Sequence, residues 1–171
     1  MTISSGAWAL IGVLIGGSIS IFKDWLMDNV AKKRKAKYLA VRVSIKLDAL
    51  LDALINVQYD NGLDEGRWPD SGEREIHYKN ISFDLGDLDV SWQSITPDLA
   101  YSILNVTSTL KDAWLLISAA YETDGNSAFH EYKRVYKQIG IDVYALRKEI
   151  AIKYKIPENK LSGSQMVELF N

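Results

Sequence analysis

The sequence predicts an all-α protein in which an N-terminal transmembrane helix continues into a cytoplasmic antiparallel three-helix bundle. Two observations support this fold class. The run from Met1 to Phe22 contains no charged side chain, and three later segments repeat apolar residues at spacings of three and four. The chain has 171 residues, so the part outside the first helix is long enough for one compact domain.

Residues 1–28 are predicted to form the transmembrane anchor. About 20 apolar residues, rising 1.5 Å each, cross the roughly 30 Å hydrocarbon core of a bilayer as a helix. Trp8 and Trp25 bracket most of the run, and tryptophan favours the two membrane interfaces. A cleaved signal peptide and a buried core helix are the alternatives. A signal peptide carries its positive charge before the apolar core, whereas here the first charge, Lys23, follows it.

A basic cluster follows the anchor and predicts its orientation. It consists of Lys32, Lys33, Arg34, Lys35 and Lys37. Because Lys and Arg accumulate on the cytoplasmic side, we expect a single-pass protein of the bacterial inner membrane with its N-terminus outside and its C-terminal domain in the cytoplasm. Basic residues near a membrane also attract anionic headgroups, so the lipid bilayer is the first predicted partner.

The net charge of −2 is unevenly divided along the chain. Residues 1–47 carry a net charge of +6, and residues 48–171 carry −8. The acidic part should be held away from an anionic membrane or should face a basic partner, which predicts a cytoplasmic protein partner. The same acidic charge argues against direct contact with nucleic acid.

The anchor carries a face of small residues. Gly12, Gly16 and Ser20 recur every four residues, so they share one side of a helix and allow a second backbone to approach closely. This pattern predicts self-association or binding of a partner membrane helix. The alternative is a glycine-tolerant anchor that binds no other helix.

The remaining chain divides into four predicted parts. Residues 29–58 form a juxtamembrane basic segment and the first bundle helix, and 59–95 form a loop or extended segment. Residues 96–160 form a two-helix hairpin that completes the bundle, and 161–171 form a C-terminal tail that caps the bundle or serves as a docking peptide.

Apolar seams and local stop signals define the three helices. Thr96-Pro97-Asp98 begins the second helix, Asp124-Gly125-Asn126 ends it, Ser127 is expected to cap the third, and Pro157 ends that one. Ile45, Leu51 and Ile55 are expected to widen the first seam. The three seams are Ala36, Ala40, Val43, Leu47, Leu50, Leu54 and Val57; Leu99, Ile103, Val106, Leu110, Ala113, Ile117 and Ala120; and Phe129, Tyr132, Tyr136, Ile139, Val143, Leu146 and Ile150.

The sequence offers little for catalysis, and we expect no enzyme, cofactor or metal. The chain has no cysteine, which excludes disulfides, thiolate nucleophiles and Cys-ligated zinc. Its two histidines, His77 and His130, stand apart from any metal-binding motif and are expected to be packed or surface residues. The acidic group Asp84, Asp87 and Asp89 lacks the spacing of a calcium loop and is interpreted as a solvated loop.

The closing run ALRKEIAIKYKIPEN, residues 145–159, resembles a pattern, roughly A-x-x-L-R-x-x-Y-x-[LI]-P, near the end of uncharacterised small bacterial proteins that also begin with one membrane helix. The resemblance implies the same architecture and assigns no residue roles.

Two functions fit this architecture. One is a membrane-acting effector, of the toxin or anti-phage-defence type that includes retron-associated proteins, which self-associates and perturbs the bilayer. The other is a membrane anchor or adaptor whose cytoplasmic helical bundle recruits a soluble partner. We favour the effector because a plain anchor does not need so glycine-rich a span.

Overall fold

The computed structural model describes residues 5–63, 74–79, 81–86, 88 and 92–157, with side chains from Phe22 onward. These residues form a helical bundle. The elements are α1 (Ser5–Tyr59), the 3-10 helix η2 (Trp92–Ser94), α2 (Pro97–Tyr121) and α3 (Gly125–Tyr154). No strand occurs among the residues described, so the predicted all-α class is confirmed.

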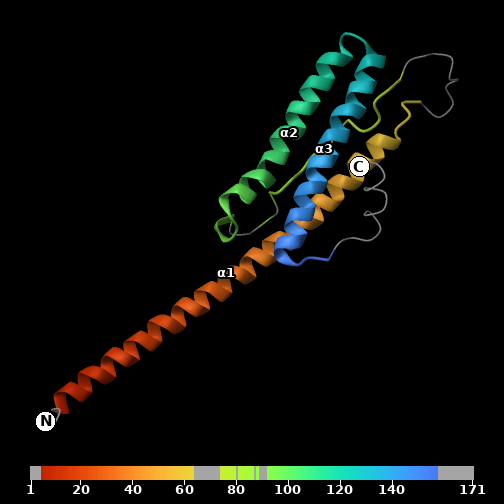
Figure 1. Cartoon of the computed structure of the whole chain (residues 1–171). Helices are drawn as coiled ribbons and strands as arrows, with labels where there is room; N and C mark the ends of the chain where they lie inside the picture. Colours follow the sequence, from red (N-terminus) through yellow and green to blue (C-terminus); the bar gives the residue numbers. More distant parts are fainter. Residues whose placement is uncertain (1–4, 64–73, 80, 87, 89–91, 158–171) are drawn as a thin grey trace.

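Helix α1 is a single helix of 55 residues, about 80 Å long at 1.5 Å per residue. Only its second half belongs to the bundle, and the first half projects beyond it (Figure 1). The predicted seam from Ala36 to Val57 is buried throughout. Full burial of a Leu or Val side chain contributes roughly 1.5–3 kcal/mol, so this seam is the main attachment of α1 to the bundle.

The prediction for Ile45 is wrong. Leu51 and Ile55 are buried and widen the seam as expected, but the Ile45 side chain is 60% exposed. The widened stripe therefore extends to one side only. The reason is that α1 packs mainly on α3, with η2 beside it, whereas Ile45 lies on the face of α1 opposite to the seam residue Leu47.

No helix long and apolar enough to cross a membrane is found in the part of the chain that the structure describes in full. The predicted anchor, residues 1–28, falls mostly outside that part, because side chains are described only from Phe22. The membrane-spanning half of the predicted fold class therefore gains no support from the structure.

The structure agrees with the predicted N-terminal residue of α2 and corrects the predicted N-cap of α3. Thr96 is the N-cap of α2, with Pro97 in the first turn, although its side chain makes no capping hydrogen bond. The N-cap of α3 is Asp124, not Ser127. The Asp124 carboxylate accepts hydrogen bonds from the backbone N–H groups of Asn126 and Ser127, which satisfies two donors that the first helical turn leaves free.

Helix α3 lies between α1 and α2 (Figure 1) and runs antiparallel to both. The register with α1 is marked by Gln58, whose Nε2 donates to the Lys133 carbonyl oxygen at 3.0 Å. The chain between α1 and α2 returns along the bundle and buries Ile76, Phe83 and Ile95 in the core. Because of this return, α1 and α2 run in the same direction, which a bundle of three helices joined by short turns would not allow.

Candidate functional site

The projecting part of α1 exposes an unusual number of apolar side chains. Phe22, Trp25, Leu26, Met27 and Val30 are all exposed. The rings of Phe22 and Trp25 stack with centroids 6.0 Å apart. Figure 1 shows this stretch extending away from the bundle as a lone helix. Lys23, Asp24 and Asp28 are exposed in the same stretch, so the helix there is mixed in character, and its large apolar side chains favour an apolar environment or a partner that covers them.

The basic cluster lies where this helix enters the bundle. Lys32, Lys33, Arg34, Lys35 and Lys37 are all exposed, whereas Ala36 between them is the first buried residue of the α1 seam. The cations therefore form a collar around α1 between the apolar exposed stretch and the bundle. Their placement suits contact with an anionic surface, because none of these side chains is buried.

The predicted association residues lie on the first half of α1. Gly12, Gly16 and Ser20 belong to one continuous helix, as does Trp8, but their side chains lie outside the residues described. Of the two predicted interface tryptophans, only Trp25 is described, and it is exposed. The structure therefore places these residues on the same continuous helix as the basic collar.

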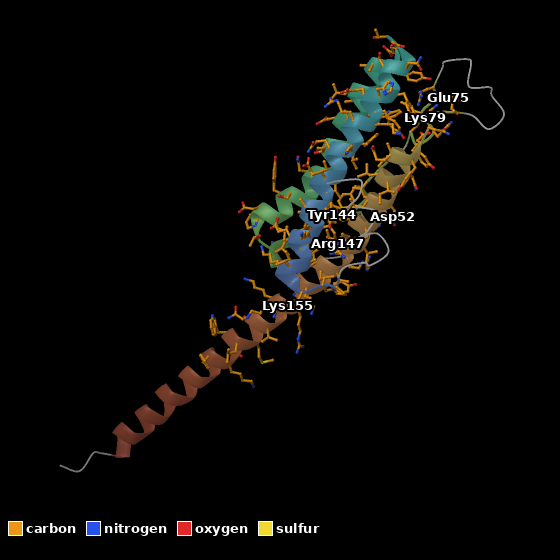
Figure 2. All side chains as sticks on the ribbon, turned by 45° about the vertical axis from the view of Figure 1, so that its right-hand side comes forward. Asp52, Glu75, Lys79, Tyr144, Arg147 and Lys155 are labelled. Atoms are coloured by element: carbon orange, nitrogen blue, oxygen red, sulfur yellow. The ribbon has the colours of Figure 1, made fainter. Side chains whose placement is uncertain are left out.

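A buried ion pair joins α1 firmly to α3, and the sequence reasoning missed it. Arg147 donates from Nε to Asp48 Oδ1 at 2.8 Å and from Nη2 to Asp48 Oδ2 at 3.1 Å. Its Nη2 also donates to the Pro157 carbonyl oxygen, whereas its Nη1 is buried without a partner. Burial and the nearby Asp48 charge raise the pKa of Asp52, one turn further along α1. Figure 2 shows Arg147 and Asp52 on the two facing helices.

A second polar cluster lies at the far end of α1. The Asp60 side chain is 1% exposed and accepts hydrogen bonds from the backbone N–H of Gly62 and from both the backbone N–H and Nδ1 of His77. Lys133 donates from Nζ to the Asp60 carbonyl oxygen. These hydrogen bonds attach the returning chain to the tip of α1.

The histidines and the acidic group singled out in the sequence do not come together in the described residues. No group of three potential metal ligands occurs among them. His130 is exposed on α3, and Asp84 accepts a hydrogen bond from the backbone N–H of Gly86 within its own turn. Asp87 and Asp89 lie outside the described residues.

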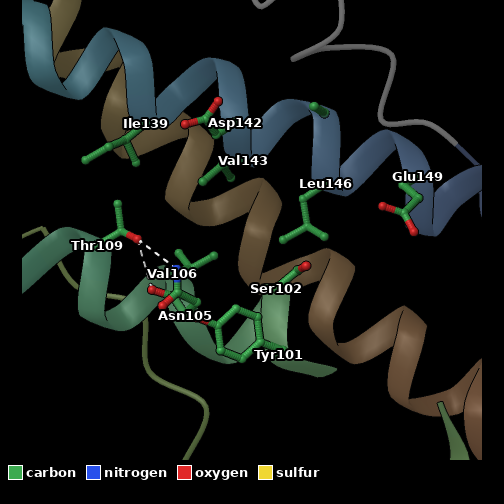
Figure 3. Close-up of a pocket in the computed structure, with 11 residues that line it drawn as sticks. Tyr101, Ser102, Asn105, Val106, Thr109, Ile139, Asp142, Val143, Leu146 and Glu149 are labelled. Carbon is green, nitrogen blue, oxygen red and sulfur yellow. Dashed lines mark hydrogen bonds between the residues drawn. The ribbon is translucent and has the colours of Figure 1, made fainter. Parts of the chain in front are cut away.

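Two grooves flank α2. The first, of about 390 Å³, lies between α2 and α3, and Figure 3 shows its floor of Val106, Ile139 and Val143. The α3 side of this groove carries the carboxylates of Asp142 and Glu149. The second groove, of about 470 Å³, lies on the other side of α2, where the returning chain packs. Its lining includes Lys79, Phe83, Lys111, Trp114 and Leu115.

The chain matches no protein-family model, no curated protein and no solved structure.

Proposed function

We propose that this chain is a non-enzymatic single-span protein of the bacterial inner membrane that acts on the membrane through self-association of its N-terminal helix. In this proposal the chain is an effector of the toxin or anti-phage-defence type, comparable in architecture to retron-associated effectors. Residues 1–28 form the span, the N-terminus faces outward, and the bundle lies in the cytoplasm.

The observation that carries the proposal is the continuity and exposure of α1. One uninterrupted helix connects the uncharged N-terminal run to the bundle. Where its side chains are described, it exposes Phe22, Trp25 and Met27 ahead of the basic collar, together with the charged residues Lys23, Asp24 and Asp28. An apolar helix followed by a ring of cations fits insertion in a bilayer with the collar at the headgroups.

The same rod supplies a mechanism for the effector. Because no break occurs in α1 between Ser5 and Tyr59, a change in how two bundles associate turns or brings together the helices attached to them. Gly12, Gly16 and Ser20 then allow close packing of the spans. In this proposal, assembly of the close-packed spans is the step that perturbs the bilayer.

The effector hypothesis is tested by expressing the natural chain and a matched variant in cells. Cells induced to make the natural chain should arrest growth and lose membrane potential. The double variant Gly12→Ile and Gly16→Ile, at the same level in the membrane fraction, should restore both, because the added side chains keep two helices apart. Equal toxicity of the two chains, or recovery of the protein in the soluble fraction, would contradict the proposal.

A second candidate function is an adaptor that holds a soluble protein at the membrane. The observation in its favour is the pair of grooves beside α2, which present apolar floors with charged rims. An adaptor should keep its function when residues 1–22 are replaced by an unrelated membrane span, whereas an effector acting through its own span should lose it. Depolarisation that survives this replacement would rule out the effector mechanism.

A further inference from the structure

The outer face of α2 carries an exposed ridge. Tyr101 is 70% exposed and Leu115 is 67% exposed, and Leu104 is exposed between them. Ser108 and Ala119, also exposed, complete the same helix face at spacings of four and seven residues. The buried residues of α2, from Leu99 to Ile117, lie on the opposite side. We refer to Tyr101, Leu104, Ser108, Leu115 and Ala119 as the α2 ridge.

The two sides of the α2 ridge carry opposite charges. Tyr101 borders the groove whose lining includes the carboxylates of Asp142 and Glu149. Leu115 borders the groove whose lining includes Lys79 and Lys111.

The same division appears on α2 itself. Lys111 and Asp112 are both exposed, and at 100° per residue they fall on either side of the ridge. Lys111 lines the basic groove, and Asp112 lies on the side of the ridge toward α2's Asn105 and Thr109, which line the acidic groove. A surface with an apolar centre, one acidic side and one basic side can be complementary to itself.

The direction of the two-fold axis decides whether the acidic side of one copy faces the basic side of the other. When two copies pack through the α2 ridge about a two-fold axis parallel to α2, the acidic side of each copy faces the basic side of the other. Lys111 of one copy then opposes Asp112 of the second copy, twice. A two-fold axis perpendicular to α2 that makes the helices antiparallel places acid opposite acid and base opposite base, which is unfavourable.

The parallel arrangement is also the one that a shared membrane imposes. Because α1 and α2 run in the same direction (Figure 1), two chains anchored by their N-terminal helices in one bilayer hold their α2 helices parallel. This second argument rests on the proposed function, whereas the charge argument does not.

We propose that the α2 ridge binds a second copy of this chain, with the two α2 helices parallel and the Lys111 and Asp112 side chains paired across the interface. The interface lies on the bundle and is separate from the Gly12–Gly16–Ser20 face of α1.

The cysteine-free sequence allows a direct test in the full chain, because a single introduced cysteine has no competing thiol. Ser108→Cys, at the centre of the ridge, should give a disulfide-linked dimer on mild oxidation of cell membranes. Lys148→Cys, exposed on α3, is the matched control and should give none. Adding Lys111→Glu to Ser108→Cys should abolish the dimer, and adding both Lys111→Glu and Asp112→Lys should restore it. Restoration excludes a loss caused by misfolding.

Orientation is tested with two tagged chains made together, one carrying Leu104→Cys and the other Leu115→Cys. A parallel interface forms disulfides between two Leu104→Cys chains and between two Leu115→Cys chains. An antiparallel interface forms them between one Leu104→Cys chain and one Leu115→Cys chain. Mixed products, or a Ser108→Cys dimer that ignores the charge exchange, would overturn the proposal, as would the absence of any dimer. Fractionation and membrane potential report on the proposed function, so the two proposals can fail separately.

Discussion

Breaking the Asp48–Arg147 pair should weaken the attachment of α1 to the bundle more than any other single polar change. The guanidinium lies in the α1–α3 interface with only 8% of its side chain exposed, and the Asp48 side chain is 19% exposed. Asp48→Ala leaves this cation without its counter-ion, and Nη1 already lacks a partner. Removing one partner of a buried pair typically costs about 3–5 kcal/mol. Because Asp48 retains some solvent, we expect about 3 kcal/mol here.

Replacing both partners should be far less harmful. The double variant Asp48→Leu and Arg147→Met removes the desolvation cost of the two charges together, so its stability should lie within about 1 kcal/mol of the natural chain. Asp28→Ala, an exposed carboxylate on the projecting part of α1, is the control and should change stability by less than about 0.5 kcal/mol.

The assay is urea unfolding of the full chain in a mild detergent, monitored by near-ultraviolet circular dichroism. This signal reports packing in the bundle, whereas helix content would also report the projecting half of α1. The reasoning is refuted if Asp48→Ala costs less than about 1 kcal/mol, or if the double variant is as unstable as the single one.

Three further predictions test the packing. Gly62→Ala should destabilise the tip of α1, because Gly62 has a φ of +70° and an added Cβ would lie 2.8 Å from Phe129 Cε2. Amide hydrogen exchange of the returning chain should become faster in this variant. An unchanged exchange rate would contradict the prediction. Leu47→Ala should cost about 2–5 kcal/mol in urea unfolding whereas Ile45→Ala should cost less than about 0.5 kcal/mol, and equal costs would place Ile45 in an interface. Burial, and secondarily the Asp60 charge, raises the pKa of Tyr132 above its ordinary value of 10.0. The folded protein therefore holds this proton more tightly than the unfolded chain, so stability should fall above pH 10, and Tyr132→Phe should flatten that fall in alkaline unfolding curves.

The buried seams could be predicted from the sequence because each depends only on the spacing of apolar residues within one helix. The spacing from Leu99 to Ile117 predicts a buried face, and that face is buried. Ile45 was wrongly added to the seam: at 100° per residue it lies about 160° around α1 from Leu47, on the opposite face, and its side chain is exposed.

The hydrogen-bond partners of the buried polar residues could not be predicted from the sequence, for a different reason. Asp48 and Arg147 lie 99 residues apart in the chain, and two of the donors to the Asp60 carboxylate come from His77, 17 residues away. No local spacing distinguishes these residues from the exposed Asp28 or Asp142. A cluster of charges along one helix, such as Lys32 to Lys37, can be recognised in sequence because its members are neighbours.

The sequence by itself determined the all-α class, the apolar seams of the three helices and the exposed basic collar, because each follows from the repeat of one helix or the charge of one segment. The tertiary structure decided that α1 and α2 run in the same direction on either side of α3. It also decided which charges are buried as pairs and that α2 keeps an exposed ridge between an acidic and a basic groove. These features depend on how the returning chain brings distant segments together, and that arrangement is set by packing across the whole bundle.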